Sequence, residues 1–164
     1  MQKIYGAPGP QNGLYKIGKN KWELFYGFGK DNDQEETGWN YRERFDHRPS
    51  LDEIKETIVG VIESEYADKL RYGLTWNELP VEYTEERKSD LTGMLVAMQA
   101  GIMELPVTLN LGTYPDGSPV FHEFAKPEEI IGVAKAISNH KIAVCNAEWQ
   151  EKSSVDWSVY ETEQ

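Results

Sequence analysis

The chain has 164 residues, of which 39% are hydrophobic, and its formal net charge at pH 7 is −11. No stretch approaches the ~20 apolar residues of a membrane-spanning helix, and the first residues lack the apolar run of a secretory signal. The single cysteine, Cys145, cannot form an internal disulfide, so no oxidising compartment is implied. We therefore expect a soluble protein of one domain or two small ones, without a membrane partner.

The negative charge is concentrated in the second part of the chain. Residues 1–74 hold 11 basic and 13 acidic side chains, whereas residues 75–164 hold 6 and 15. This distribution argues against binding of a phosphate backbone by the second part and leaves such binding open for the first.

The first part predicts a three-stranded antiparallel meander after a turn-rich opening. Strands are expected at residues 14–17, 21–28 and 39–46. Hydrophobic residues alternate along the last two strands, which predicts one buried face and one wet face. The buried face would carry Trp22, Leu24, Tyr26, Phe28, Trp39, Tyr41 and Phe45, and the wet face Asn40, Arg42, Arg44 and Asp46.

A helix is predicted to cover this meander. Ser50 and Glu53 have the spacing of a capping box, in which each side chain satisfies a free backbone amide of the other residue. Apolar residues recur at helical spacing from Leu51 to Leu70, and Gly73 is suited to end the helix.

The second part predicts the order β-α-β-β-α. A strand at residues 76–83 contains Pro80, which suits an edge position, and Thr84 is a natural N-cap for the next helix. A hairpin of residues 105–111 and 120–124 follows, and Pro127 begins the final helix. Residues expected to be buried in the two helices are Leu91, Leu95, Met98, Ile102, Ile130, Val133, Ala134, Ile137, Val144 and Trp149. The fold class is thus α+β, with parts at 1–74 and 75–164 that could share one core.

Two segments nearly match known site motifs, but each lacks a residue that the motif requires. Residues 13–20 nearly spell a P-loop, but Asn20 stands where a hydroxyl residue is needed and a strand follows instead of a helix. Asp31, Asp33 and Glu35 alternate like ligands of a calcium loop, but Glu36 replaces the required glycine.

The remaining reactive residue types are scattered. The histidines His47, His122 and His140 have no second ligand at metal-site spacing, and Cys145 lies in an apolar segment that predicts a buried, inert thiol. We therefore predict no catalytic, cofactor-binding or metal-ligating residues and a protein that is not an enzyme. An enzyme with an unfamiliar site would have only Asp31, Asp33, His122 and Glu123 to use.

One alternative is a small nucleic-acid-binding module. A three-stranded sheet backed by a helix can place its strands in the major groove of DNA. The residues that would make contact are Lys19, Lys21, Arg42 and Arg44. The overall acidity argues against this reading.

Three short segments of the second part, taken in order, carry a family resemblance. They are Trp76-Asn77-x-x-Pro80-Val81, then Leu105-Pro106-Val107-Thr108-Leu109 with Pro119-Val120-Phe121-His122, and finally residues 148–152 before Val155-Asp156-Trp157. Residues 75–158 thereby resemble an uncharacterised domain family encoded by bacteriophages and by prophages of gut bacteria, often among tail and tail-fibre proteins.

The resemblance implies a phage context and no catalytic residues. We expect a structural component of the tail region or a helper of fibre assembly, located in the bacterial host cytoplasm or in the virion. It would act through protein–protein contacts with other phage proteins or with copies of itself. The expected interface residues are Trp76, Tyr83 and Trp157.

Overall fold

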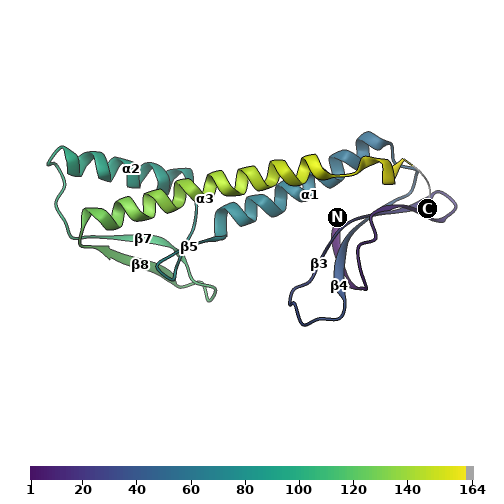
Figure 1. The fold of residues 1–164 in the computed structure, drawn as a ribbon, viewed down its shortest axis with the longest axis horizontal. Coiled ribbons are helices and arrows are strands. Elements are labelled where there is room, and N and C mark those ends of the chain that lie inside the picture. Colours follow the sequence, from purple (N-terminus) through teal and green to yellow (C-terminus); the bar gives the residue numbers. More distant parts are fainter. Residues whose placement is uncertain (162–164) are drawn as a thin grey trace. The chain divides into compact units, whose positions relative to one another are not determined.

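A computed structural model describes residues 1–161 of the chain, which form two compact units (Figure 1). The first unit contains Met1–Glu63 and the segment that begins at Glu151, and the second contains Ser64–Gln150. Each of the two long helices contributes residues to both units: α1 spans Leu51–Tyr72 and α3 spans Pro127–Ser154. The division between the units therefore falls inside these helices, whereas the sequence suggested a boundary near residue 74.

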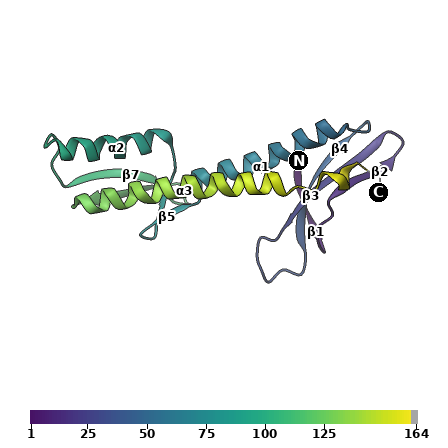
Figure 2. The same cartoon turned by 45° about the horizontal axis from the view of Figure 1, so that its top comes forward.

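The first unit is built on a four-stranded antiparallel sheet with the order β1-β4-β3-β2 (Figure 2). The strands are β1 (Gln2–Ala7), β2 (Gly13–Gly18), β3 (Lys21–Gly29) and β4 (Gly38–Phe45). The last three correspond to the predicted meander. β1 was missed because Gly6 and Pro8 were interpreted as turn residues, whereas residues 2–7 pair with β4, more than 30 positions along the chain.

The core of the first unit contains the alternating residues of β3 and the first half of α1. Trp22, Leu24 and Tyr26 are all buried, as the period of two predicted, and Ile54, Ile58 and Ile62 of α1 are buried too. Capping is also as predicted, because Ser50 Oγ accepts from the Glu53 amide at 3.2 Å and the Ser50 amide donates to Glu53 Oε2 at 2.8 Å.

The predicted wet face of β4 was wrong at one position. Asn40 is only 1% exposed. Its side chain accepts a hydrogen bond from the Gln11 amide and donates one to the Gly9 carbonyl, each at 3.1 Å. The β1–β2 loop therefore covers this residue, and a polar side chain is buried because the loop supplies both partners.

The second unit begins where α1 ends. The predicted strand at 76–83 is instead a tight hairpin of β5 (Leu74–Trp76) and β6 (Leu79–Val81). Asn77 and Glu78 adopt positive φ angles of 48° and 64° at the turn, a conformation that a single extended strand could not contain. Thr84 caps α2 (Glu85–Gln99), as expected, by accepting from the Arg87 amide at 3.0 Å.

The remaining elements of the second unit are the hairpin of β7 (Val107–Thr113) and β8 (Pro119–Phe124), and most of α3. Figure 1 shows this hairpin beside α2 and α3. Their shared core includes Leu91, Leu111, Val120, Phe124, Ile130, Val133 and Ile137. Ile102, predicted to be buried, is 81% exposed because α2 ends at Gln99, before that residue.

The short 3-10 helix η1 (Trp157–Tyr160) follows α3 and belongs to the first unit. Within residues 1–161, no helix is both long enough and apolar enough to cross a membrane.

Candidate functional site

The most distinctive surface of the second unit is an exposed apolar face of α3. Ile131, Ile142 and Trp149 are 52%, 60% and 74% exposed. Because an α-helix turns by about 100° per residue, these three positions lie within about 20° of one another around the helix axis. They therefore form one line along the helix, and Lys135 and Ser138 lie between them on the same side. We call these five residues the α3 face.

The opposite side of α3 explains why this face is free. Ile130, Val133 and Ile137 are at most 1% exposed and pack into the core of the unit. His140 accompanies them, with Nε2 3.1 Å and 3.0 Å from the carbonyl oxygens of Lys69 and Leu70. A helix that carries apolar residues on two sides buries one side in its own unit and leaves the other for solvent or a partner.

Charge is scarce on the α3 face. Between residues 131 and 150, Lys135 is the one exposed charged residue, whereas Lys141 and the carboxylate of Glu148 are partly buried. In a protein with a net charge of −11, such a stretch differs from the acidic average of the chain. Depletion of charge together with an exposed Trp is typical of the centre of a protein-binding surface.

Trp149 was predicted to point inward, and this was wrong. The apolar run before it suggested a continuation of the buried stripe, but the core contacts of α3 involve residues nearer its start. Val144 is only partly buried, and so is Cys145, which was expected to be fully buried. Ile131, Ile142 and Trp149 do form a second apolar line at helical spacing in the sequence, but the spacing does not tell which of the two lines is buried.

The three interface residues expected from the sequence do not form one patch. Trp76 is partly buried in the second unit, where its ring stacks on Phe124 at a centroid distance of 5.9 Å. Tyr83 is only 7% exposed. Trp157 lies in the first unit, 6.3 Å from the ring of Tyr160. Their role as interface residues stays a prediction.

Tyr83 instead takes part in a polar cluster that joins α2 to α3. Its hydroxyl donates to Glu85 Oε1, which also pairs with Lys141 Nζ, each at 2.6 Å. The hydrogen bond from Lys141, followed by that from Tyr83, lowers the pKa of Glu85 to about 2. The carboxylate is therefore ionised at all physiological pH values, which suits a structural ion pair better than proton transfer.

The basic residues proposed for nucleic-acid contact are partly neutralised. Glu23 Oε1 lies 3.4 Å from Arg42 Nη1 and 2.8 Å from Arg44 Nε. Lys21 and Arg44 nevertheless line the same open cavity of about 810 Å³, together with Ile17, Trp22, Phe45 and Asp46. Lys19 and Arg42 do not line it, so the structure brings two of the four residues together. Nucleic-acid binding stays a prediction.

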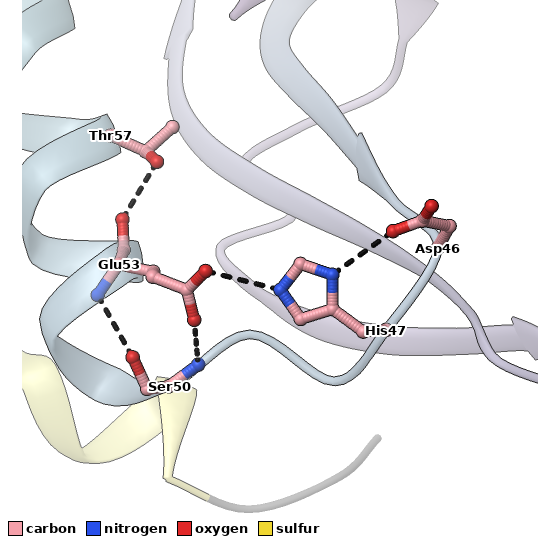
Figure 3. A network of polar contacts seen from close by, with 5 residues as sticks. All are labelled: Asp46, His47, Ser50, Glu53 and Thr57. Carbon is pink, nitrogen blue, oxygen red and sulfur yellow. Dashed lines mark hydrogen bonds and ion pairs between the residues drawn. The ribbon is translucent and has the colours of Figure 1, made fainter.

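A hydrogen-bonded network surrounds the start of α1 in the first unit (Figure 3). His47 lies between two carboxylates, with Nδ1 3.0 Å from Asp46 Oδ1 and Nε2 3.1 Å from Glu53 Oε1. The hydrogen bond to Asp46, then that to Glu53, raises the pKa of His47. Ser50 is engaged in the capping box, so its hydroxyl is not positioned as a nucleophile toward His47.

The residues considered for an unfamiliar enzyme site are also separated. Asp31 accepts a hydrogen bond from Trp39 Nε1 in the first unit, whereas His122 packs between Trp76 and Phe124 in the second. The Nε2 atom of His122 is buried, makes no hydrogen bond in the described part of the chain and lies 4.0 Å from Glu129 Oε1. Among residues 1–161, no three His, Cys, Asp or Glu side chains are grouped so as to hold a metal ion.

No protein-family model matches this sequence, and no curated protein or solved structure is significantly similar to it. The resemblance of residues 75–158 to a phage-encoded domain family therefore stays a prediction. The α3 face is the feature of the structure on which a functional proposal can be based.

Proposed function

We propose that this chain is a non-enzymatic bacteriophage or prophage protein that acts through protein–protein contacts. Its role would be that of a structural component of the tail region or of a helper in fibre assembly. The observation that carries the proposal is the α3 face, where Ile131, Ile142 and Trp149 are all more than half exposed on one side of one helix.

Two physical arguments support a binding role for this surface. Burial of a fully exposed large apolar side chain contributes about 1.5–3 kcal/mol. Ile131, Ile142 and Trp149 each keep more than half of their surface exposed, so a partner that covers them would gain more than half of that amount for each. The face also lies on a long helix anchored by a buried stripe, so binding needs little ordering of the backbone. The phage context comes from the resemblance of residues 75–158.

The proposal is tested by deleting the gene from the phage or prophage that encodes it and supplying variants in trans. Trp149→Glu places a charge at the most exposed residue of the α3 face, and Ser64→Glu places the same charge at an exposed position of α1 in the same unit. We expect wild type and Ser64→Glu to restore the titre of infectious particles, and Trp149→Glu to reduce it by tenfold or more.

Full restoration by Trp149→Glu, or a deletion without effect on particle formation, would refute the proposed role. Mass spectrometry of purified particles then separates the two forms of the proposal. A fixed copy number relative to known tail proteins identifies a tail component, whereas absence from particles and abundance in the lysate identify an assembly helper.

A further inference from the structure

We infer that the α3 face pairs with the same face of a second copy of this chain, in an antiparallel arrangement centred on Ile142. The inference rests on the proposed function, since it names the partner of the same surface. It follows from the low charge of the face and from the symmetric placement of its residues about Ile142. The antiparallel direction follows because a parallel pair would bring like charges together.

Charge decides which surfaces two copies can share. Two molecules that each carry a net charge of −11 repel one another, and opposing carboxylates at a contact would add to this repulsion. On α3 the exposed residues from 131 to 150 include no carboxylate and one cation, Lys135. A second copy therefore meets less repulsion here than at a surface of average composition.

The residues on the α3 face are spaced symmetrically. Lys135 and Trp149 each lie seven residues from Ile142, one before it and one after it. Seven residues are close to two turns, so both stay on the same side of the helix as Ile142. When two such helices run antiparallel about Ile142, Lys135 of each copy lies opposite Trp149 of the other.

This register gives complementary contacts from Lys135 to Trp149. An ammonium group within about 6 Å of an indole ring is attracted to it, and the pair would form twice. Ile142 meets its own counterpart at the centre, and Ser138 lies opposite the uncharged Asn146. A parallel pair would instead place Lys135 against Lys135, so the antiparallel direction is favoured.

A second exposed apolar pair does not offer the same symmetry. Val96 and Ile102 are 60% and 81% exposed near the end of α2. Residues 91–103 contain no charged side chain, so no cation accompanies these two residues. They lie on either side of the helix end at Gln99, whereas the α3 face is one continuous helical line.

The size of the face sets the expected strength. From Lys135 to Trp149, the stretch that this register places in contact, the helix rises by about 21 Å, and a helix is about 10 Å wide, which gives a footprint of roughly 200 Å² per copy. A standard stable interface buries about 800 Å² per partner. We therefore expect reversible pairing with a Kd in the range from about ten micromolar to one millimolar.

The experiment is sedimentation equilibrium of the full chain from about 10 µM to about 1 mM, a range chosen to span that Kd. We expect the average mass to rise from 18.8 kDa toward twice that value. Trp149→Lys should raise the Kd about tenfold or more. It removes both cation–ring contacts, and it places the new ammonium group of each copy opposite Lys135 of the other copy. Adding Lys135→Trp to that variant exchanges the two residues and should restore the original Kd.

A second measurement uses covalent capture at the predicted centre. Ile142→Cys in a Cys145→Ser chain should form an intermolecular disulfide under mild oxidation, whereas Ser64→Cys in the same background should not. An average mass that stays at 18.8 kDa up to the highest concentration would overturn the inference. So would failure of the exchanged variant to restore pairing. If Trp149→Glu nevertheless lowers the titre of infectious particles by tenfold or more, the face binds a different phage protein and the proposed function stands.

Discussion

Asn40 should be the most important polar side chain of the first unit. It is 1% exposed, and it joins β4 to the loop between β1 and β2 through two hydrogen bonds. The substitution Asn40→Ala removes both bonds at once. It leaves the Gly9 carbonyl and the Gln11 amide without their partners at a partly buried site.

The expected cost follows from these two groups. A buried donor or acceptor that loses its partner costs about 1–3 kcal/mol. Because both contacts are only partly buried, we use the lower half of that range for each group and expect a loss of about 2–4 kcal/mol in the free energy of unfolding. Small domains are stable by about 5–15 kcal/mol, so this loss is large.

Urea denaturation followed by tryptophan fluorescence measures the effect, since Trp22 and Trp39 lie in the same sheet as Asn40. The control is Asn12→Ala in the same loop, where the side chain is exposed and a change within about 0.5 kcal/mol is expected. A loss below about 0.5 kcal/mol for Asn40→Ala would refute the reasoning, because it would mean that loop and strand are held together by other contacts.

Two further predictions concern backbone space and pH. A Cβ added at Gly38 would lie 2.1 Å from the Gly29 carbonyl oxygen, whereas one added at Gly60 in α1 would meet nothing within 4 Å. We therefore expect Gly38→Ala to lower the Tm strongly or to prevent folding, and Gly60→Ala to raise the stability by about 0.5–1 kcal/mol; equal Tm values for the two variants would contradict this. The raised pKa of His47 means that its stabilising contribution is complete below the ordinary histidine value of about 6.5 and is lost as pH rises through the higher folded value. Thermal melts from pH 5 to 9 should show a decline in wild type that His47→Gln lacks, and parallel profiles would disprove this role of His47.

Much of the fold was predictable because local chemistry determines it. The capping box of Ser50 and Glu53 identified the start of α1, and Thr84 identified the start of α2, since each satisfies amides of its own first turn. The period of two in β3 placed Trp22, Leu24 and Tyr26 on the buried face. These signals involve residues close together in the chain and need no knowledge of distant partners.

The prediction failed where the deciding partner is remote in sequence. β1 forms because residues 2–7 pair with the edge of β4, more than 30 positions along the chain. The turn-forming residues Gly6 and Pro8 carry no information about that distant edge. Trp149 follows an apolar run and was expected inside, but the core of the second unit is filled by Ile130, Val133 and Ile137 of the same helix. Its exposure depends on which elements pack against α3, not on the helix pattern.

The sequence by itself determined the α+β class, the helix starts and the alternation of the central strands, because capping, turn chemistry and periodicity act within a few residues. Only the tertiary structure decided that Asn40 is buried, that the paired strands include β1 and that α3 presents Ile142 and Trp149 to solvent. Whether a residue is buried depends on the neighbours that chain topology brings together. An amphipathic pattern shows which residues are apolar, but it does not show which elements cover them.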